Sequence, residues 1–316
     1  MGAVTTTLLD RPAADRAAPA PPLLLLACAL GTVYVAWGST YVAVRVMVGE
    51  MPTLLGTGTR ALAAGALLAV GVVVWRGPHR LLLTRTELAG CAAIGVLLPV
   101  GGQGLVAVAE DRGAPSGLTA LLIAAVPLWV ACLRTFAGDR PPPRSLVGVL
   151  VGFAGVAGLI AAEGGAGATP TWALLVVVVA SMSWALGTWL QPRLELPRDP
   201  FVLVTYEMLI GGVVLTLLGA LQGERLDPGS YSTQAWGAWA FLLLVGSILA
   251  LTAYNWLLQS TSVSVVATYA YVNPAIAVFL GWLLLGEAVT GTRVVAALVI
   301  VAGVALVLTA ERKARS

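Results

Sequence analysis

The stretch TYAYVNPAIAVFLGWLLLGE, residues 268–287, decides the fold, because it is apolar enough to lie in lipid and yet contains a proline. Tyr269, Tyr271 and Asn273 stand just before that proline, Pro274. A proline inside a helix removes one backbone donor and leaves a carbonyl unpaired. A bilayer tolerates such a defect only where the backbone is buried in protein or lines a wet cavity. We therefore expect this helix to face other helices or a cavity.

The same stretch has a counterpart earlier in the chain. Residues 113–162 align with residues 261–310 without a gap, which places Gly155 on Gly303. A spacing of about 148 residues is far longer than the period of a solenoid repeat. The alignment therefore indicates a duplication of a large unit.

The composition places the chain in the membrane. Hydrophobic residues make up 59% of the sequence and charged residues only 10%, whereas soluble domains have about 25% charged residues. This balance predicts an integral membrane protein that contacts the lipid bilayer. The net charge of +3 is too small and too scattered to indicate a nucleic-acid partner.

The cysteines and the single histidine argue against a metal or cofactor site. Cys28, Cys91 and Cys132 are odd in number and lie in apolar runs, which is typical of free buried thiols. His79 lies in a loop. We expect no metal and no cofactor.

Ten apolar spans, each close to the ~20 residues that cross a bilayer, are expected along the chain. They lie at about 23–44, 53–75, 87–108, 115–133, 146–162, 171–191, 201–221, 236–259, 262–285 and 289–308. The fold class is thus all-α, with ten transmembrane helices in two inverted five-helix repeats. The predicted units are a disordered cytoplasmic tail at 1–22, repeat one at 23–162, repeat two at 171–310 and a cytoplasmic tail at 311–316.

The basic residues predict the orientation. With the N-terminus in the cytoplasm, thirteen Arg and Lys residues lie on the inner side and four on the outer side, and cytoplasmic loops carry the excess of positive charge. We therefore expect both termini in the cytoplasm. Five spans per repeat is an odd number, so the second repeat enters the membrane in the opposite sense. Inverted repeats of this kind are typical of alternating-access carriers.

Matching polar and aromatic stripes on the first and sixth spans point to a central cavity. A shift of 147 residues relates the two stripes, each of which lies on one helix face. The matched pairs are Tyr34 and Ser181, Trp37 and Trp184, and Tyr41 and Thr188. The alternative is aromatic packing between helices, together with anchoring at the membrane interface.

The third and eighth spans carry breaks at corresponding places, which is a further indicator of a binding site. Pro99 and neighbouring glycines interrupt the third span, and Gly246 with Ser247 interrupts the eighth. Gln103 is the polar group expected nearest a substrate. Glycines that only allow close helix contact are the alternative. The predicted substrate-binding residues are Tyr34, Trp37, Ser39, Tyr41, Gln103, Ser181, Trp184, Thr188, Tyr254, Tyr271 and Asn273.

Two ionisable residues fall inside spans. Arg60 lies ~10 Å below the outer surface and Glu207 ~9 Å above the inner surface. At mid-membrane a charge costs roughly 2.5–3.5 kcal/mol, so charged residues within spans usually face the interior of the bundle. Glu207 is a candidate for proton or cation binding, and Arg60 for a counter-charge or a carboxylate site. The alternative is that both side chains reach the nearer interface. Because their depths differ, we do not expect a direct pair.

Three motifs resemble the drug/metabolite transporter superfamily, in particular its ten-helix EamA-type exporters. They are WGSTYVAVR at 37–45, PSGLTALLIAAVP at 115–127 and the stretch at 268–287, and the resemblance covers about residues 23–310. It implies an inner-membrane carrier with spans 1, 3, 4, 6, 8 and 9 around a cavity and spans 5 and 10 at the edge. The first repeat departs from the family pattern at Asp139 and in the triple proline 141–143.

The expected function is export of small metabolites, amino acids or drug-like compounds by alternating access. Aromatic walls favour aromatic or other apolar amino acids, and a proton is a candidate coupling ion. A passive facilitator or channel is the alternative. A membrane-embedded enzyme is a remote one, because the spans carry no paired carboxylates, histidine cluster or nucleophile with a base. The run Gly148, Gly152 and Gly155 serves packing or a dimer seam, so monomer and homodimer both remain open.

Overall fold

The computed structural model describes residues 22–138, 142–165 and 169–315, and within them all regular structure is helical. Eight helices of this part are long and apolar enough to cross a membrane, and shorter apolar helices at Val272–Leu285 and Gly291–Val307 bring the spans to ten. The prediction of an all-helical membrane protein with ten spans is therefore confirmed. The predicted N-terminal tail lies outside the described residues except for Pro22.

Within the described residues, the first five spans contain eight helical segments, because the third span has three and the fourth has two, and the short helix η1 (Pro78–Leu81) lies in the loop between the second and third spans. The eight are α1 (Leu23–Val48), α2 (Thr53–Arg76), α3 (Arg85–Gly95), η2 (Val96–Gly104), α4 (Leu105–Asp111), α5 (Ser116–Ile123), α6 (Val126–Phe136) and α7 (Pro143–Gly165). The third span is α3, η2 and α4 in one continuous helix, and the fourth is α5 and α6.

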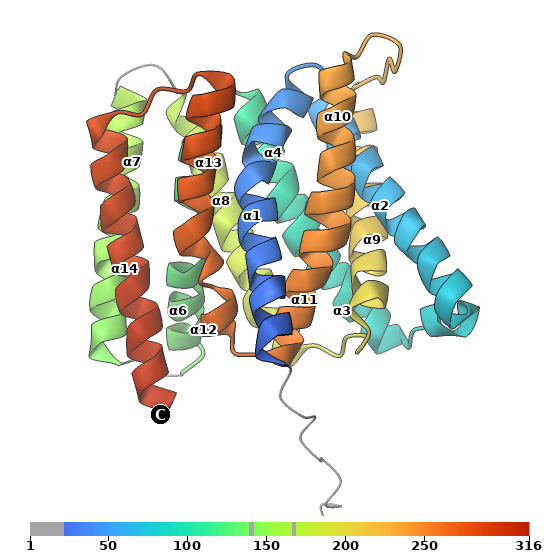
Figure 1. Cartoon of the computed structure of the whole chain (residues 1–316), viewed down its shortest axis with the longest axis horizontal. Coiled ribbons are helices and arrows are strands. Elements are labelled where there is room, and N and C mark those ends of the chain that lie inside the picture. The colour runs from blue at the N-terminus through green and yellow to red at the C-terminus, as the bar shows by residue number, and fades with distance from the viewer. Residues whose placement is uncertain (1–21, 139–141, 166–168, 316) are drawn as a thin grey trace, which may run out of the picture.

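The second five spans repeat this pattern. They are α8 (Thr171–Leu190), η3 (Gln191–Arg193), α9 (Pro200–Leu221), α10 (Thr233–Phe241), η4 (Leu242–Ala250), α11 (Leu251–Ser260), α12 (Val263–Val266), α13 (Tyr269–Leu285) and α14 (Gly291–Arg315). The final helix thus continues into the predicted C-terminal tail. The first and last helices have their chain-terminal ends at the same end of the bundle (Figure 1).

Two helix pairs form opposite edges of the molecule, with α7 beside α14 at one edge and α2 beside α9 at the other (Figure 1). Glycines let the backbones approach closely, as small residues do in membranes. A Cβ on Gly148 would lie 2.7 Å from the Gly303 carbonyl oxygen, and one on Gly58 would lie 2.7 Å from the Thr216 amide nitrogen. Gly148 therefore serves packing between helices of one chain. The remaining spans lie between the two edges.

The predicted breaks in the third and eighth spans are π-helical segments, η2 and η4. Pro99 lies inside η2, and Gly246 lies inside η4. Short π-helical segments within α-helices occur frequently at functional sites. Both segments lie at the middle of their spans, which places them beside the centre of the bundle.

The ninth span is interrupted before its proline and not at it. The chain turns between α12 and α13, next to Thr268, whereas Pro274 lies within α13. The first half of α13 carries buried residues such as Tyr269 and Asn273, and the helix packs against α1 and α5. Phe279 in its second half is 55% exposed on the outer surface. Ala277 in the same half is fully buried, so one face of α13 packs against neighbouring helices along its length, as expected.

Candidate substrate cavity

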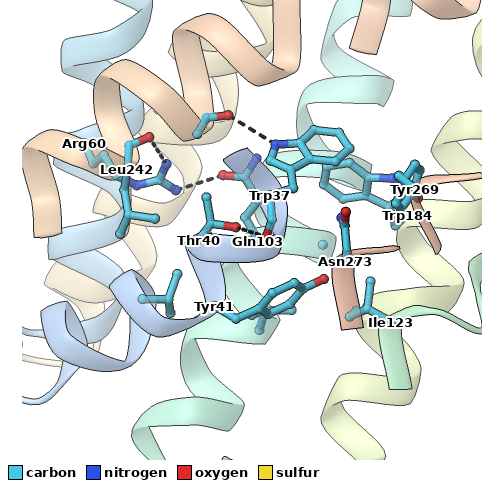
Figure 2. Close-up of a pocket in the computed structure, with 14 residues that line it drawn as sticks. Trp37, Thr40, Tyr41, Arg60, Gln103, Ile123, Trp184, Leu242, Tyr269 and Asn273 are labelled. Carbon is cyan, nitrogen blue, oxygen red and sulfur yellow. Dashed lines mark hydrogen bonds between the residues drawn. The ribbon is translucent and has the colours of Figure 1, made fainter. Parts of the chain in front are cut away.

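A central cavity of about 80 Å³ lies between the two edge pairs, and seven spans contribute to its wall. Its lining residues are Trp37, Thr40, Tyr41, Val44, Arg60, Gly102, Gln103, Val106, Ile123, Trp184, Leu242, Gly246, Tyr269 and Asn273 (Figure 2). Spans 1, 3, 4, 6, 8 and 9 contribute, as the resemblance implies, and the second span adds Arg60. Typical ligand pockets measure roughly 300–1,000 Å³, so the cavity is small for a metabolite in this conformation.

Aromatic rings form one wall of the cavity, and they pack edge to face. The ring centroid of Trp37 lies 5.2 Å from that of Trp184 at 89°, and 5.5 Å from that of Tyr269 at 87°. The Trp37 indole nitrogen donates to the Gly246 carbonyl oxygen at 3.3 Å, inside the π-helical segment η4. The edge-to-face arrangement is the one that aromatic quadrupoles favour. The matched tryptophans of the two repeats thus meet at the centre of the molecule.

Arg60 forms a polar part of the wall, and it is only 3% exposed. One terminal nitrogen, Nη1, donates to the Leu242 carbonyl oxygen at 3.2 Å, and Nη2 donates to Gln103 Oε1 at 2.8 Å (Figure 2). Nη1 also donates to Ser247 Oγ at 2.5 Å. Its Nε has no partner among the described residues. The side chain therefore points into the bundle and does not reach the membrane surface.

The partners of Arg60 are neutral, and no carboxylate within the described part of the chain pairs with it. The ion pairs found there join Arg76 to Asp199 and Arg112 to Asp111. A buried charge without an opposite charge is destabilising. Arg60 consequently offers an uncompensated positive charge at the cavity wall.

Asn273 orders the wall between α1 and α13. With its amide nitrogen placed as the donor, it reaches the carbonyl oxygens of Tyr269 at 3.2 Å and Tyr34 at 3.1 Å. The Tyr34 hydroxyl in turn shares a hydrogen bond with Thr268 Oγ1. Tyr34 therefore fixes the helices around the cavity, and it is not among the residues that line it.

Several other predicted site residues support the cavity from behind. The Thr188 hydroxyl bonds to the Tyr254 hydroxyl at 2.6 Å, and the Tyr254 ring packs 4.8 Å from that of Trp37. Ser181 accepts from the indole nitrogen of Trp129 at 2.9 Å. The contact of Tyr254 positions the aromatic wall, whereas the bond between Ser181 and Trp129 joins α8 to α6.

Two further predicted residues contribute no described contact to the cavity. The Ser39 hydroxyl donates to the Val35 carbonyl oxygen of its own helix at 2.6 Å. Tyr271 belongs to α13, and its side chain lies outside the part of the chain that the structure describes.

Glu207 lies away from the cavity lining and is fully buried. Its Oε2 accepts from Asn255 Nδ2 at 2.9 Å, and Asn255 Oδ1 accepts from Gln191 Nε2 at 2.7 Å. Its Oε1 has no partner among the described residues. The ion pairs of this part do not include one between Glu207 and Arg60, in keeping with the expectation from their depths.

Sequence reasoning missed Tyr269 as a lining residue and Glu110 as a buried acid. Tyr269 stands four residues before Asn273 and so shares its helix face, which was a usable signal. Glu110 lies at the end of the third span, yet it is fully buried, and neither carboxylate oxygen has a partner within the described chain. Arg45 donates to its backbone carbonyl oxygen instead. Because Glu110 stands near the end of its span, the sequence gave no indication that its side chain is buried.

At the end of the bundle opposite the chain termini, glutamates of the second repeat cap helices of the first. Glu287 accepts from the amides of Ser116 at 2.8 Å and Gly117 at 3.1 Å, at the start of α5. Glu224 accepts from the amides of Leu54 at 3.1 Å and Leu55 at 2.7 Å, at the start of α2. A carboxylate at a helix N-terminus satisfies free donors and the helix dipole. These caps join the two repeats at one end of the cavity.

A third acid acts at the same end, outside the spans. Glu50 accepts from the Ser232 amide at 2.7 Å and from its hydroxyl at 2.6 Å, just before α10. These hydrogen bonds lower the pKa of Glu50 below its usual value. The loop after α1 is thereby joined to the start of the eighth span.

Comparison with known proteins gives a consistent result. The model of the EamA-like transporter family matches residues 23–161 and again residues 171–309. A protein of Escherichia coli (strain K12), described as "Uncharacterized inner membrane transporter YedA", is 38% identical over 285 residues, which cover 90% of this chain and 91% of that protein. A Salmonella typhimurium protein, "Probable amino-acid metabolite efflux pump", is 26% identical over 280 residues, covering 86% and 90%. One solved crystal structure has the same fold, with a TM-score of 0.65 and 19% identity over 92% of this chain and 99% of that chain.

Proposed function

Because the chain belongs to the EamA-like transporter family, we propose that it exports small metabolites that combine an apolar body with a carboxylate. Aromatic and other apolar amino acids belong to this class, as do related drug-like compounds. The chain is a multi-pass transporter of the inner membrane. Its substrate and its direction of transport are the proposed part.

One observation carries the proposal, namely that a single cavity joins an aromatic wall to a buried guanidinium. Trp37, Trp184 and Tyr269 offer surfaces for an apolar or aromatic body. Arg60 offers N–H donors in a planar arrangement that suits a carboxylate. A compound with both features would contact both parts of the wall. The name of the Salmonella relative, an amino-acid metabolite efflux pump, agrees with this class.

Two observations support alternating access, namely the small size of the cavity and the duplicated architecture. A cavity of about 80 Å³ holds a few water molecules, so the helices must move apart to admit a metabolite. Two repeats that rock against each other around a fixed central site are the general solution in transporters. The glutamate caps Glu224 and Glu287 join the repeats at one end, and we propose that they separate when that end opens.

Glu207 is the proposed coupling residue. It is a buried acid with one hydrogen-bonded oxygen and one oxygen without a described partner. Ionisable residues inside spans mark ion pathways and proton relays in many transporters. We propose that Glu207 binds and releases a proton as the carrier alternates.

The experiment that tests the proposal measures counterflow of a labelled apolar carboxylate in proteoliposomes, with phenylpyruvate, phenylalanine and leucine tried in turn. Trp37→Ala and Trp184→Ala are each expected to reduce flux by about tenfold, since burying an aromatic ring contributes a few kcal/mol and part of that acts on the substrate. Trp282→Ala is the matched control, because the same ring is removed from a residue that is 55% exposed on the outer surface. Normal flux in both cavity variants would leave the aromatic wall as packing only.

A passive channel is the second candidate, and the same assay separates it from a carrier. A carrier gives saturable flux and accelerated exchange when unlabelled substrate is present on the far side. A pore gives neither. Selective pores use rings of charge or of backbone carbonyls, and the described cavity lining consists mainly of apolar and aromatic side chains.

A further inference from the structure

The described side chains that line the cavity carry positive charge but no negative charge. Among the residues that line it, Arg60 is the one ionised side chain, and no aspartate or glutamate is present. Glu207 is bonded to Asn255 and lies outside the lining. The cavity therefore carries a positive charge without a negative one.

The surroundings of Arg60 do not cancel this charge. Its three described hydrogen bonds end on neutral oxygens, those of Leu242, Ser247 and Gln103. Its Nε–H is buried with no partner among the described residues. Neutral acceptors satisfy donors, but a buried cation is stabilised mainly by an opposite charge. A bound anion would supply that charge.

An ammonium group would be poorly placed in the same cavity. It would add a second positive charge to a small, water-poor space, where like charges repel strongly. The neutral oxygens of Gln103 and Asn273 could accept from it without neutralising it. Contact with the faces of Trp37 or Trp184 is weaker than pairing with a carboxylate. For a zwitterion, the carboxylate thus strengthens binding and the ammonium group weakens it.

We propose that the species carried is a monoanion, a carboxylate with an apolar or aromatic body and no ammonium group. Such compounds include 2-keto acids, 2-hydroxy acids and aryl-substituted acetic acids. This inference rests on the export function proposed above and narrows its substrates. A net negative charge then crosses the membrane with each substrate. The inside-negative potential of a cell would drive that export, because moving a charge through the potential does work.

Three compounds with the same phenyl ring test the proposal, namely phenylpyruvate, phenylalanine and phenylethylamine. They are an anion, a zwitterion and a cation at neutral pH. Each is loaded into proteoliposomes, and efflux is followed while valinomycin and a potassium gradient fix the membrane potential. Protein-free liposomes correct for leakage. We expect saturable phenylpyruvate efflux that is faster with an inside-negative potential. At equilibrium, a tenfold potassium gradient should give about a tenfold anion gradient.

The variant Gln103→Glu provides the sharper comparison. Gln103 Oε1 already lies 2.8 Å from Arg60 Nη2, so a glutamate of nearly the same shape would pair with the guanidinium. The cavity would then be neutral. We expect phenylpyruvate efflux to fall by about tenfold or more, because the substrate loses a hydrogen bond between charged groups, while phenylalanine efflux falls less. Arg60→Gln should also lower phenylpyruvate efflux, and Arg60→Lys, which keeps the charge, should restore part of it.

The outcomes separate this inference from the function on which it rests. Phenylalanine efflux equal to or faster than that of phenylpyruvate in the wild-type protein would overturn the monoanion and leave export in place. The monoanion would also be overturned if phenylpyruvate efflux did not depend on the membrane potential. The same holds if Gln103→Glu left the preference for phenylpyruvate over phenylalanine unchanged. An absence of saturable flux for all three compounds, with monodisperse protein, would overturn both.

Discussion

Arg60 and Glu207 show how a membrane protein holds ionisable side chains in its interior by two different means. Arg60 is surrounded by three neutral acceptors at the cavity wall. Glu207 lies away from the cavity wall and accepts one hydrogen bond, from the side-chain amide of Asn255. The sequence predicted that both residues matter, because charges are rare in apolar spans. It could not predict that Arg60 turns inward, since that depends on acceptors from the third and eighth spans.

Glu207→Gln is expected to abolish the dependence of flux on a pH gradient while exchange of substrate for substrate continues. The glutamine is nearly isosteric, and its amide oxygen can still accept from Asn255, so the fold should persist. It cannot bind and release a proton, which is the physical reason for the loss. The measurement is pH-driven uptake into inside-out vesicles.

The control for this experiment is Glu195→Gln, which makes the same chemical change at an exposed position. It should behave as the wild-type protein does. If Glu207→Gln and the wild-type protein show the same pH dependence, Glu207 has no part in coupling, and a facilitator driven by the substrate gradient is favoured.

At the level of elements, the sequence predicted where helices are disturbed but not how. Pro99 and Gly246 marked matching breaks in the third and eighth spans, and both lie in π-helical segments. A proline or glycine shows that a regular helix is weakened. Which hydrogen-bond pattern replaces it depends on packing against neighbours. For the same reason, the ninth span turns near Thr268 and not at Pro274.

The seam between α7 and α14 should be sensitive to a single methyl group. A Cβ on Gly148 would lie 2.7 Å from the Gly303 carbonyl oxygen and 2.8 Å from the Val307 amide nitrogen. These are backbone atoms, so Gly148→Ala forces the helices apart, and overpacking of this kind costs about 1–3 kcal/mol. We expect a lower melting temperature in detergent than for the wild-type protein.

Gly158→Ala is the matched control on the same helix. A Cβ there meets nothing within 4 Å, and alanine in a helix is favoured over glycine by roughly 0.5–1 kcal/mol. Its melting temperature should therefore stay equal or rise slightly. Equal melting temperatures for Gly148→Ala and Gly158→Ala would show that the α7–α14 contact does not contribute to stability.

At the scale of the whole molecule, internal duplication made most of the architecture predictable. Ten spans and two repeats follow from hydropathy and from the alignment of the two halves. The matched stripes also placed Trp37 and Trp184 at a common cavity, where their rings meet. The remaining wall was harder to predict. Helix periodicity ranks faces within one span, but it does not fix the rotation of each helix against six others. Tyr34 and Ser181 therefore lie on the predicted faces and yet bond behind the lining.

The orientation in the membrane is the last prediction, and it concerns the whole chain. The loops at 76–86 and 134–145 carry three arginines each, and positive charge is enriched in cytoplasmic loops. The start of α1 and the end of α14 lie at the same end of the bundle (Figure 1). We therefore expect both loops and both termini in the cytoplasm, with the loop at 222–235 on the outer side.

Single-cysteine labelling with a membrane-impermeant reagent measures this orientation. The background replaces the free cysteines Cys28, Cys91 and Cys132 by serine or alanine. Arg80→Cys and Ala137→Cys, at exposed positions of the two arginine-bearing loops, should label only after the cells are permeabilised. Gly229→Cys, in the exposed loop before α10, should label in intact cells. The reverse labelling pattern would show that the protein has the opposite orientation in the membrane. The end joined by Glu224 and Glu287 would then face the cytoplasm and not the outer side.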